Sequence, residues 1–150
     1  MEEDVEYIEI ENETKLVKTY RNGRYEVSVG NSTISQLCFD DSRITKIRVY
    51  SSSGPLFFSK CFISSLEVER CNGLQIRLGD VTILEAKLKE SSDIILQQSH
   101  TRKLVDIRMM EITNCETITI EINNSINLDA HGVKNLSIEN QLTNKMKYLV

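Results

Sequence analysis

The chain has 150 residues and a net charge of −4, with acidic and basic residues interspersed, one proline and no tryptophan. This length fits one domain with a sizeable core, and the mildly acidic balance argues against a nucleic-acid binder, which needs a basic face. No apolar run approaches the roughly 18 residues of a membrane span, and the acidic N-terminus lacks the basic and apolar regions of a secretion signal.

Strand-like alternation recurs along the whole chain, whereas helical periodicity is weak. Polar connectors such as Arg21-Asn22-Gly23 and Asn72-Gly73 supply Gly and Asn, which accept positive φ. We therefore expect an all-β single domain over 1–150, in which 1–20 form a peripheral strand or are partly disordered. In chain order, the alternating stretches are 7–10, 25–29, 47–49, 66–68, 74–78, 94–96 and 136–138.

One pattern nearly repeats itself along the chain. The run Leu66-x-Val68-x-x-Cys71-x-x-Leu74 returns as Met110-x-Ile112-x-x-Cys115-x-x-Ile118, and a third copy between them has Ala86, Ser91 and Ile94. The copies are offset by 20 and 24 residues, and such periods predict a solenoid of stacked coils. The small residue at the same bend of each copy favours a parallel β-helix. An antiparallel sandwich also gives short alternating strands, so it remains an alternative architecture.

The cysteines are Cys38, Cys61, Cys71 and Cys115. Without a secretion signal, we expect reduced thiols in a cytosolic protein, three or four of them buried as small hydrophobes. Their spacing fits no zinc site, so no metal or cofactor is expected.

Motifs for catalysis are missing from the sequence. The two histidines, His100 and His131, lie in polar stretches, and the chain contains neither a G-x-S-x-G elbow nor a phosphate-binding glycine loop. Acidic pairs such as Asp40-Asp41 are interpreted as solvated turn positions. We therefore expect no catalytic residue and no enzymatic activity.

Charged residues occupy the outward positions between the apolar ones. In a solenoid they form ladders on flat sheet faces, which either keep the protein soluble or bind a protein partner. The basic members considered for partner binding are Arg70, Arg77, Lys87, Lys89 and Arg108.

Several motifs, in order, resemble the C-terminal domain of cyclase-associated protein. Arg24–Asp41 is similar to the opening of that domain, and Ile63–Leu74 resembles its I-N-S-I-T-V-D-N-C-K-K-L segment. Glu90–Gln97 is similar to N-S-K-D-V-K-V-Q, and Leu136–Val150 resembles its closing strand pair. The resemblance covers most of the chain from Arg24 onward.

This resemblance implies a right-handed parallel β-helix with a C-terminal strand pair. It implies binding to monomeric, ADP-bound actin in the cytoplasm and cytoskeleton, with release of ADP so that ATP can replace it. It also implies a homodimer that exchanges strands within 123–150, through Leu136, Ile138, Met146 and Tyr148. Binding to nucleic acid or membrane is not expected.

The chain also departs from the family pattern. Arg24-Tyr25 replaces its K-W pair, Asn72-Gly73 replaces two corner lysines, and the family's extension after the last strand pair has no counterpart before Val150. These differences predict actin contacts that are weakened or rearranged.

Tubulin-folding cofactor C is a sister family with the same fold. Its members activate a GTPase through an arginine whose position falls on Gln75 here, while Arg77 lies two residues later on the same strand face. Two residues correspond to about 6–7 Å along a strand. The alternative function is therefore activation of a tubulin- or Arl-type GTPase by Arg77, and a further alternative is a scaffold with another partner.

Overall fold

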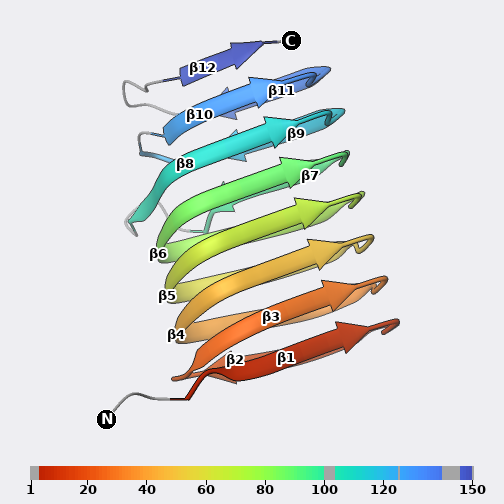
Figure 1. Ribbon diagram of the computed structural model, residues 1–150, viewed down its shortest axis with the longest axis vertical. Coiled ribbons are helices and arrows are strands. Elements are labelled where there is room, and N and C mark those ends of the chain that lie inside the picture. The colour runs from red at the N-terminus through yellow and green to blue at the C-terminus, as the bar shows by residue number, and fades with distance from the viewer. Residues whose placement is uncertain (1–3, 100–103, 125, 140–145, 150) are drawn as a thin grey trace.

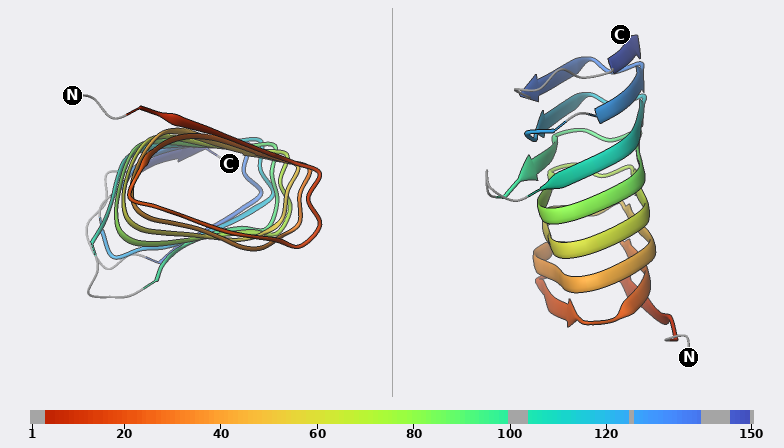
Figure 2. Two further views of the ribbon diagram at one scale, coloured as in Figure 1. Left: turned by 90° about the horizontal axis from the view of Figure 1, so that it is seen from below. Right: turned by 90° about the vertical axis from the view of Figure 1, so that its left-hand side faces the viewer.

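A computed structural model describes residues 4–99, 104–124, 126–139 and 146–149, and the chain is a right-handed parallel β-helix of about seven turns (Figure 1). Every strand pair among these residues is parallel. The prediction of an all-β parallel β-helix is confirmed, and the antiparallel sandwich is excluded. The coils are flattened in cross-section, and the two chain ends lie at opposite ends of the stack (Figure 2).

Twelve strands form the coils, and three of them are much longer than the alternation predicted. Strand β4 has 17 residues because its first half pairs with β2 while its second half pairs with β3, around one bend of the same coil. The strands are β1 (Glu6–Glu11), β2 (Leu16–Arg21), β3 (Arg24–Gly30), β4 (Ile34–Tyr50), β5 (Gly54–Glu69), β6 (Leu74–Lys89), β7 (Ile94–Gln98), β8 (Val105–Thr113), β9 (Thr117–Glu121), β10 (Ile126–His131), β11 (Asn135–Glu139) and β12 (Met146–Leu149).

The repeated apolar residues stack in register, as the 20-residue period predicts. Leu66 pairs with Ala86, and Ala86 pairs with Met110. All three side chains are fully buried. Aromatic rings stack beside them, with 5.3 Å between the ring centroids of Tyr20 and Phe39 and 5.4 Å between those of Phe39 and Phe58. One continuous interior therefore runs through the stack.

The bends use a small inward residue that satisfies the backbone. Ser91 donates a hydrogen bond from Oγ to the Lys89 carbonyl at 2.7 Å and accepts one from the Cys71 amide of the neighbouring coil at 3.1 Å. The residue before it, Glu90, has a φ of 47°, and Arg70 has a φ of 50° at the equivalent place. This geometry explains the Cys–Ser–Cys repeat, because a larger side chain would not fit inside each bend.

The two ends of the stack are built from shorter strands. Strands β1 and β2, within the segment for which a peripheral strand or disorder was considered, form the first coil and pair with β3 and β4. The C-terminal pair forms the last coil, where β11 pairs with β9 and β12 with β10. No helix in the described part of the chain could span a membrane.

Candidate interaction surface

The flattened coils present two broad sheet faces with different side-chain chemistry. The first, which we call the charged face, is the outward side of β3 and of the second halves of β4, β5 and β6, seen toward the viewer in Figure 1. Eight of the eleven outward residues are charged: Glu26, Lys46, Arg48, Glu67, Glu69, Glu85, Lys87 and Lys89. The other three are Ser28, Tyr50 and Ser65.

Charges on the charged face are arranged to neutralise one another. Arg48 pairs in register with Glu67, and Glu67 pairs with Lys87, so the sign alternates from coil to coil. Ion pairs join Lys46 to Glu67 at 3.7 Å and Arg48 to Glu69 at 3.4 Å. Exposed pairs of this kind contribute about 0–1 kcal/mol each, so they mainly keep the face soluble and its register defined.

Three of the five predicted binding cations lie at this face or at its edge. Lys87 Nζ is 3.2 Å from Glu85 Oε1, and this hydrogen bond raises the pKa of the lysine. Arg70, at the bend after β5, places Nη1 at 2.7 Å from Glu69 Oε1. Lys89 is exposed and has no carboxylate within 4.0 Å in the described part of the chain.

The other two predicted cations lie elsewhere. Arg108 is on β8 next to the bend, with Nε 3.6 Å from Asp106 Oδ2. Arg77 lies in the first half of β6, on the opposite sheet face. The structure therefore brings Arg70, Lys87 and Lys89 together and separates Arg77 from them.

The opposite face, which we call the charge-poor face, is the outward side of β2, β7 and the first halves of β4, β5 and β6. Its position behind the charged face can be followed in Figure 1. A block of ten of its outward residues contains one charge, Arg77, and all ten are exposed or half-buried: Val17, Thr19, Gln36, Cys38, Pro55, Phe57, Gln75, Arg77, Ile95 and Gln97. Two further charged residues, Arg21 and Asp40, are register partners next to this block.

Phe57 and Arg77 form the centre of the charge-poor face. They are register partners on β5 and β6, and the Arg77 guanidinium lies 5.4 Å from the Phe57 ring centroid in a cation–π contact. No carboxylate of the described residues lies within 4.0 Å of Arg77. A hollow of about 160 Å³ opens beside it, lined by Gln75, Ile76, Arg77, Ile95, Gln97 and Glu121.

The low charge of this block, with an aromatic residue and an arginine at its centre, is also typical of the cores of protein interfaces. Such cores are depleted of Lys, Glu and Asp and enriched in aromatic residues and Arg, because burying an unpaired charge under a partner is costly. Sequence reasoning identified Arg77 and missed Phe57, Pro55 and Ile95. The signal was present, since Leu56 and Phe58 point inward and alternation places Phe57 outward.

The residues predicted for dimerisation lie at the C-terminal end of the stack. Leu136 and Ile138 are on β11 and only partly buried, whereas their register partners Ile118 and Ile120 are fully buried. Met146 and Tyr148 are on β12, which pairs with β10 of the same chain. Their side chains lie outside the described residues.

Chemically reactive groups are few among the described residues. Cys61, Cys71 and Cys115 are buried, as predicted, whereas Cys38 lies on the charge-poor face. Burial raises the pKa of the Cys61 thiol to about 11 and also raises the pKa of Cys71 and Cys115. High thiol pKa values disfavour the nucleophilic thiolate.

Histidine and metal chemistry offers no further site in the part that the structure describes. His131 is exposed, with Nε2 2.6 Å from Asp129 Oδ1, and His100 lies outside the described residues. Within the described ranges, no group of three or more His, Cys, Asp or Glu side chains could hold a metal ion.

Comparison with models of protein families, with curated proteins and with solved structures finds no match to this chain.

Proposed function

We propose that this chain is a non-catalytic protein-binding solenoid that contacts its partner through the charge-poor face. The observation that carries the proposal is the low charge of ten adjacent outward positions, with Phe57 and Arg77 at their centre. Phenylalanine and arginine are both enriched in protein interfaces. On the charged face, six of the eight charged residues are already in ion pairs with one another, and this side faces solvent.

The partner that we propose is monomeric actin in its ADP-bound form, in the cytoplasm and at the cytoskeleton. The support is the ordered likeness of the coil motifs to cyclase-associated protein, together with a fold of the kind that this likeness implies. The domain would accelerate nucleotide exchange by binding the open state of actin more tightly than the closed state. Such catalysis of exchange needs no bond chemistry on this chain.

Binding of fluorescently labelled ADP–actin monomers, followed by anisotropy, tests this proposal. We expect the wild-type domain to bind and Phe57→Asp to weaken binding by tenfold or more, about 1.4 kcal/mol. Lys87→Ala, on the charged face, is the matched control and should bind like the wild type. Absence of wild-type binding, or equal losses in the two variants, would contradict the proposal.

A second candidate function is activation of a GTPase by Arg77. The observation in its favour is that the Arg77 guanidinium lies on an open sheet face without a carboxylate partner among the described residues. An arginine supplied in trans can stabilise the charge that develops at the γ-phosphate.

GTP hydrolysis by tubulin and by an Arl-type GTPase, measured with and without the domain, tests this second candidate. The replacement Arg77→Lys keeps the charge but loses the planar fork of the guanidinium. It should therefore abolish acceleration of hydrolysis while leaving binding nearly intact. No acceleration by the wild type, or equal acceleration by the variant, would remove this candidate.

A further inference from the structure

Arg77 is a cation that the fold leaves without a counter-charge. It is exposed on the charge-poor face and lies over the Phe57 ring, and within the described ranges no carboxylate comes within 4.0 Å of it. Along its own column of register partners, the next acidic residue is Glu121, two coils away beyond Gln97. Two coils correspond to about 10 Å, which exceeds the Debye length of about 8 Å at physiological salt. The Glu121 carboxylate therefore does little to compensate the charge of Arg77.

The hollow beside Arg77 has the size and the lining for one small acidic group. Its volume is about 160 Å³, and a water molecule takes about 30 Å³ in the liquid, so a carboxylate and the methylene before it fit. Gln75 and Gln97 bring amide groups to the hollow, and Ile95 adds an apolar side chain. Gln97 Nε2 donates a hydrogen bond to Glu121 Oε2 at 3.0 Å. This bond keeps the Glu121 carboxylate on the far side of Gln97.

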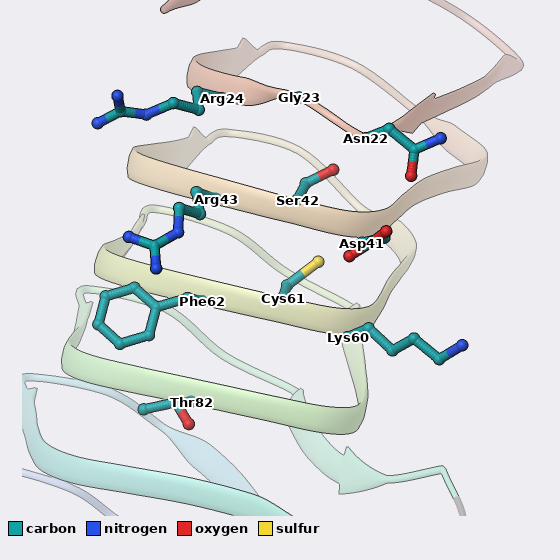
Figure 3. Close-up of a pocket in the computed structure, with 10 residues that line it drawn as sticks. All are labelled: Asn22, Gly23, Arg24, Asp41, Ser42, Arg43, Lys60, Cys61, Phe62 and Thr82. Carbon is teal, nitrogen blue, oxygen red and sulfur yellow. The ribbon is translucent and has the colours of Figure 1, made fainter. Parts of the chain in front are cut away.

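Two other arginines in the described part of the chain lie over aromatic rings, and both are placed differently. Arg48 lies 4.5 Å from the Tyr50 ring centroid, but its Nη2 is also 3.4 Å from Glu69 Oε2. Arg43 lies 5.6 Å from the Phe62 ring centroid and lines a separate recess of about 550 Å³ at the bend between the two faces. Figure 3 shows the Phe62 ring next to Arg43 at this bend. A partner on the charge-poor face would leave both arginines uncovered.

A partner that covers the charge-poor face has to supply an anion to Arg77. Burying an unpaired charge is strongly unfavourable, and a covered guanidinium without acceptors loses its hydrogen bonds to water. A carboxylate accepts two parallel hydrogen bonds from the guanidinium fork. A run of acidic residues fits less well, because Glu121 and Glu139 follow Gln97 as register partners in the same column and would repel the additional carboxylates.

We propose that the charge-poor face recognises a single aspartate or glutamate side chain of its partner, set among apolar residues, and that its carboxylate binds Arg77. This inference rests on the proposed role of the charge-poor face as the binding surface, but it holds whichever protein the partner is. Phe57 orients the guanidinium and gives the apolar residues of the partner a surface to contact. Gln75, exposed on the same side of β6, provides a further amide donor beside the carboxylate.

NMR titration with two short capped peptides tests the inference. The peptides are identical except for one central residue, glutamate or glutamine, which is flanked by leucines. The Nε–Hε signal of Arg77 should move on addition of the glutamate peptide. The wild type should prefer this peptide by about fivefold, the upper end for a solvent-exposed ion pair, and added salt should reduce the preference. Equal affinities for the two peptides, or no binding of either, would overturn the inference.

Two arginine variants make the test specific to the site. Arg77→Gln should bind the two peptides equally, because it removes both the charge and the fork. Arg43→Gln is the matched control, since it removes the same kind of cation from an aromatic ring and changes the net charge equally, but outside the face. It should keep the wild-type preference. If both variants lost the preference equally, acidic peptides would be attracted by net charge alone, and the inference would be wrong.

A further variant separates this inference from the proposed function. Phe57→Ala should weaken binding of both peptides, because it removes the apolar surface that they share. If binding of ADP–actin depends on Phe57 but the peptides show no preference for glutamate, the proposed function stands and the carboxylate contact is wrong. If Arg77 confers the preference but ADP–actin does not bind, the contact stands and the proposed partner is wrong. Thermal unfolding of each variant checks that it is folded.

Discussion

At the scale of single residues, the position of the Tyr50 ring depends on the absence of a side chain at Gly30. A Cβ at Gly30 would overlap the Tyr50 ring, which covers this glycine from the next coil. Tyr50 also donates a hydrogen bond to Glu11 Oε2 at 2.5 Å, and this bond lowers the pKa of the Glu11 carboxyl. The small residue thus allows one side chain to tie three coils together.

The Gly30–Tyr50 dependence gives the first prediction. Gly30→Ala should lower the free energy of unfolding by about 1–3 kcal/mol, because it displaces the Tyr50 ring. In the Tyr50→Ala background the same replacement should cost much less. A double-mutant cycle by urea unfolding measures the coupling, and additive effects would contradict the proposed overlap.

The thiols give a second prediction at this scale. At pH 8 a disulfide reagent should modify Cys38 rapidly in the folded protein, because this thiol is partly exposed. The other three of the four cysteines should react only on unfolding. Rapid modification of all four thiols in the folded state would contradict this prediction.

The pKa of Cys61 makes stability depend on pH. Since burial raises this pKa from 9.0 to about 11, the thiol favours the folded state below pH 9. That contribution should be lost between pH 9 and pH 11.

At the scale of elements, alternation and the period near 20 predict the coils and their buried residues. Leu66, Ala86 and Met110 stack as the repeat implies. The long strands β4, β5 and β6 were not predicted, because their internal bends occupy a single residue with positive φ, Asp41 in β4 and Asp80 in β6, and do not interrupt the strand. The bends at Lys60 and Glu90 carry no sequence signal, since neither residue type favours positive φ.

The candidate site was harder to predict than the coils. Arg77 was identified as an outward cation, but its neighbours on the surface come from other coils. The charge-poor face exists only once the register places Phe57 beside Arg77 and Ile95 beside Gln75. The residues of this surface come from several stacked strands, so the sequence of one strand does not show its composition.

Two corner glycines give a prediction for the elements. Gly54 has a φ of 109°, and a Cβ there would run into the Ile34 carbonyl oxygen of the neighbouring coil. Gly73 has a φ of 83°, but nothing lies within 4 Å of its added Cβ. Gly73→Ala should therefore cost about 1 kcal/mol of backbone strain, and Gly54→Ala clearly more. Equal losses in urea unfolding would show that the coil contact does not matter.

At the scale of the whole molecule, the open ends of the β-helix are the places where a second copy of the chain can pair. Leu136 and Ile138 in the last coil are only partly buried, whereas Ile118 and Ile120, their register partners in the preceding coil, are fully buried. An uncovered strand edge with apolar neighbours invites pairing with another chain. We therefore propose that β11 and β12 form the contact of a homodimer.

Sedimentation at micromolar concentration tests this assembly. The wild type should have the mass of a dimer, and Ile138→Glu should shift it to a monomer. Ser137→Glu, on the same strand with an exposed side chain, is the control and should stay dimeric. A monomeric wild type would contradict the dimer proposal. It would not bear on the proposal that the charge-poor face binds the partner.

The most direct test of the whole account is the rate at which nucleotide leaves monomeric ADP–actin. The account predicts that the wild-type domain accelerates release, that Phe57→Asp abolishes the acceleration, and that Lys87→Ala retains it. The contradicting result is a release rate that the wild-type domain does not change, or one that Phe57→Asp raises as much as the wild type does.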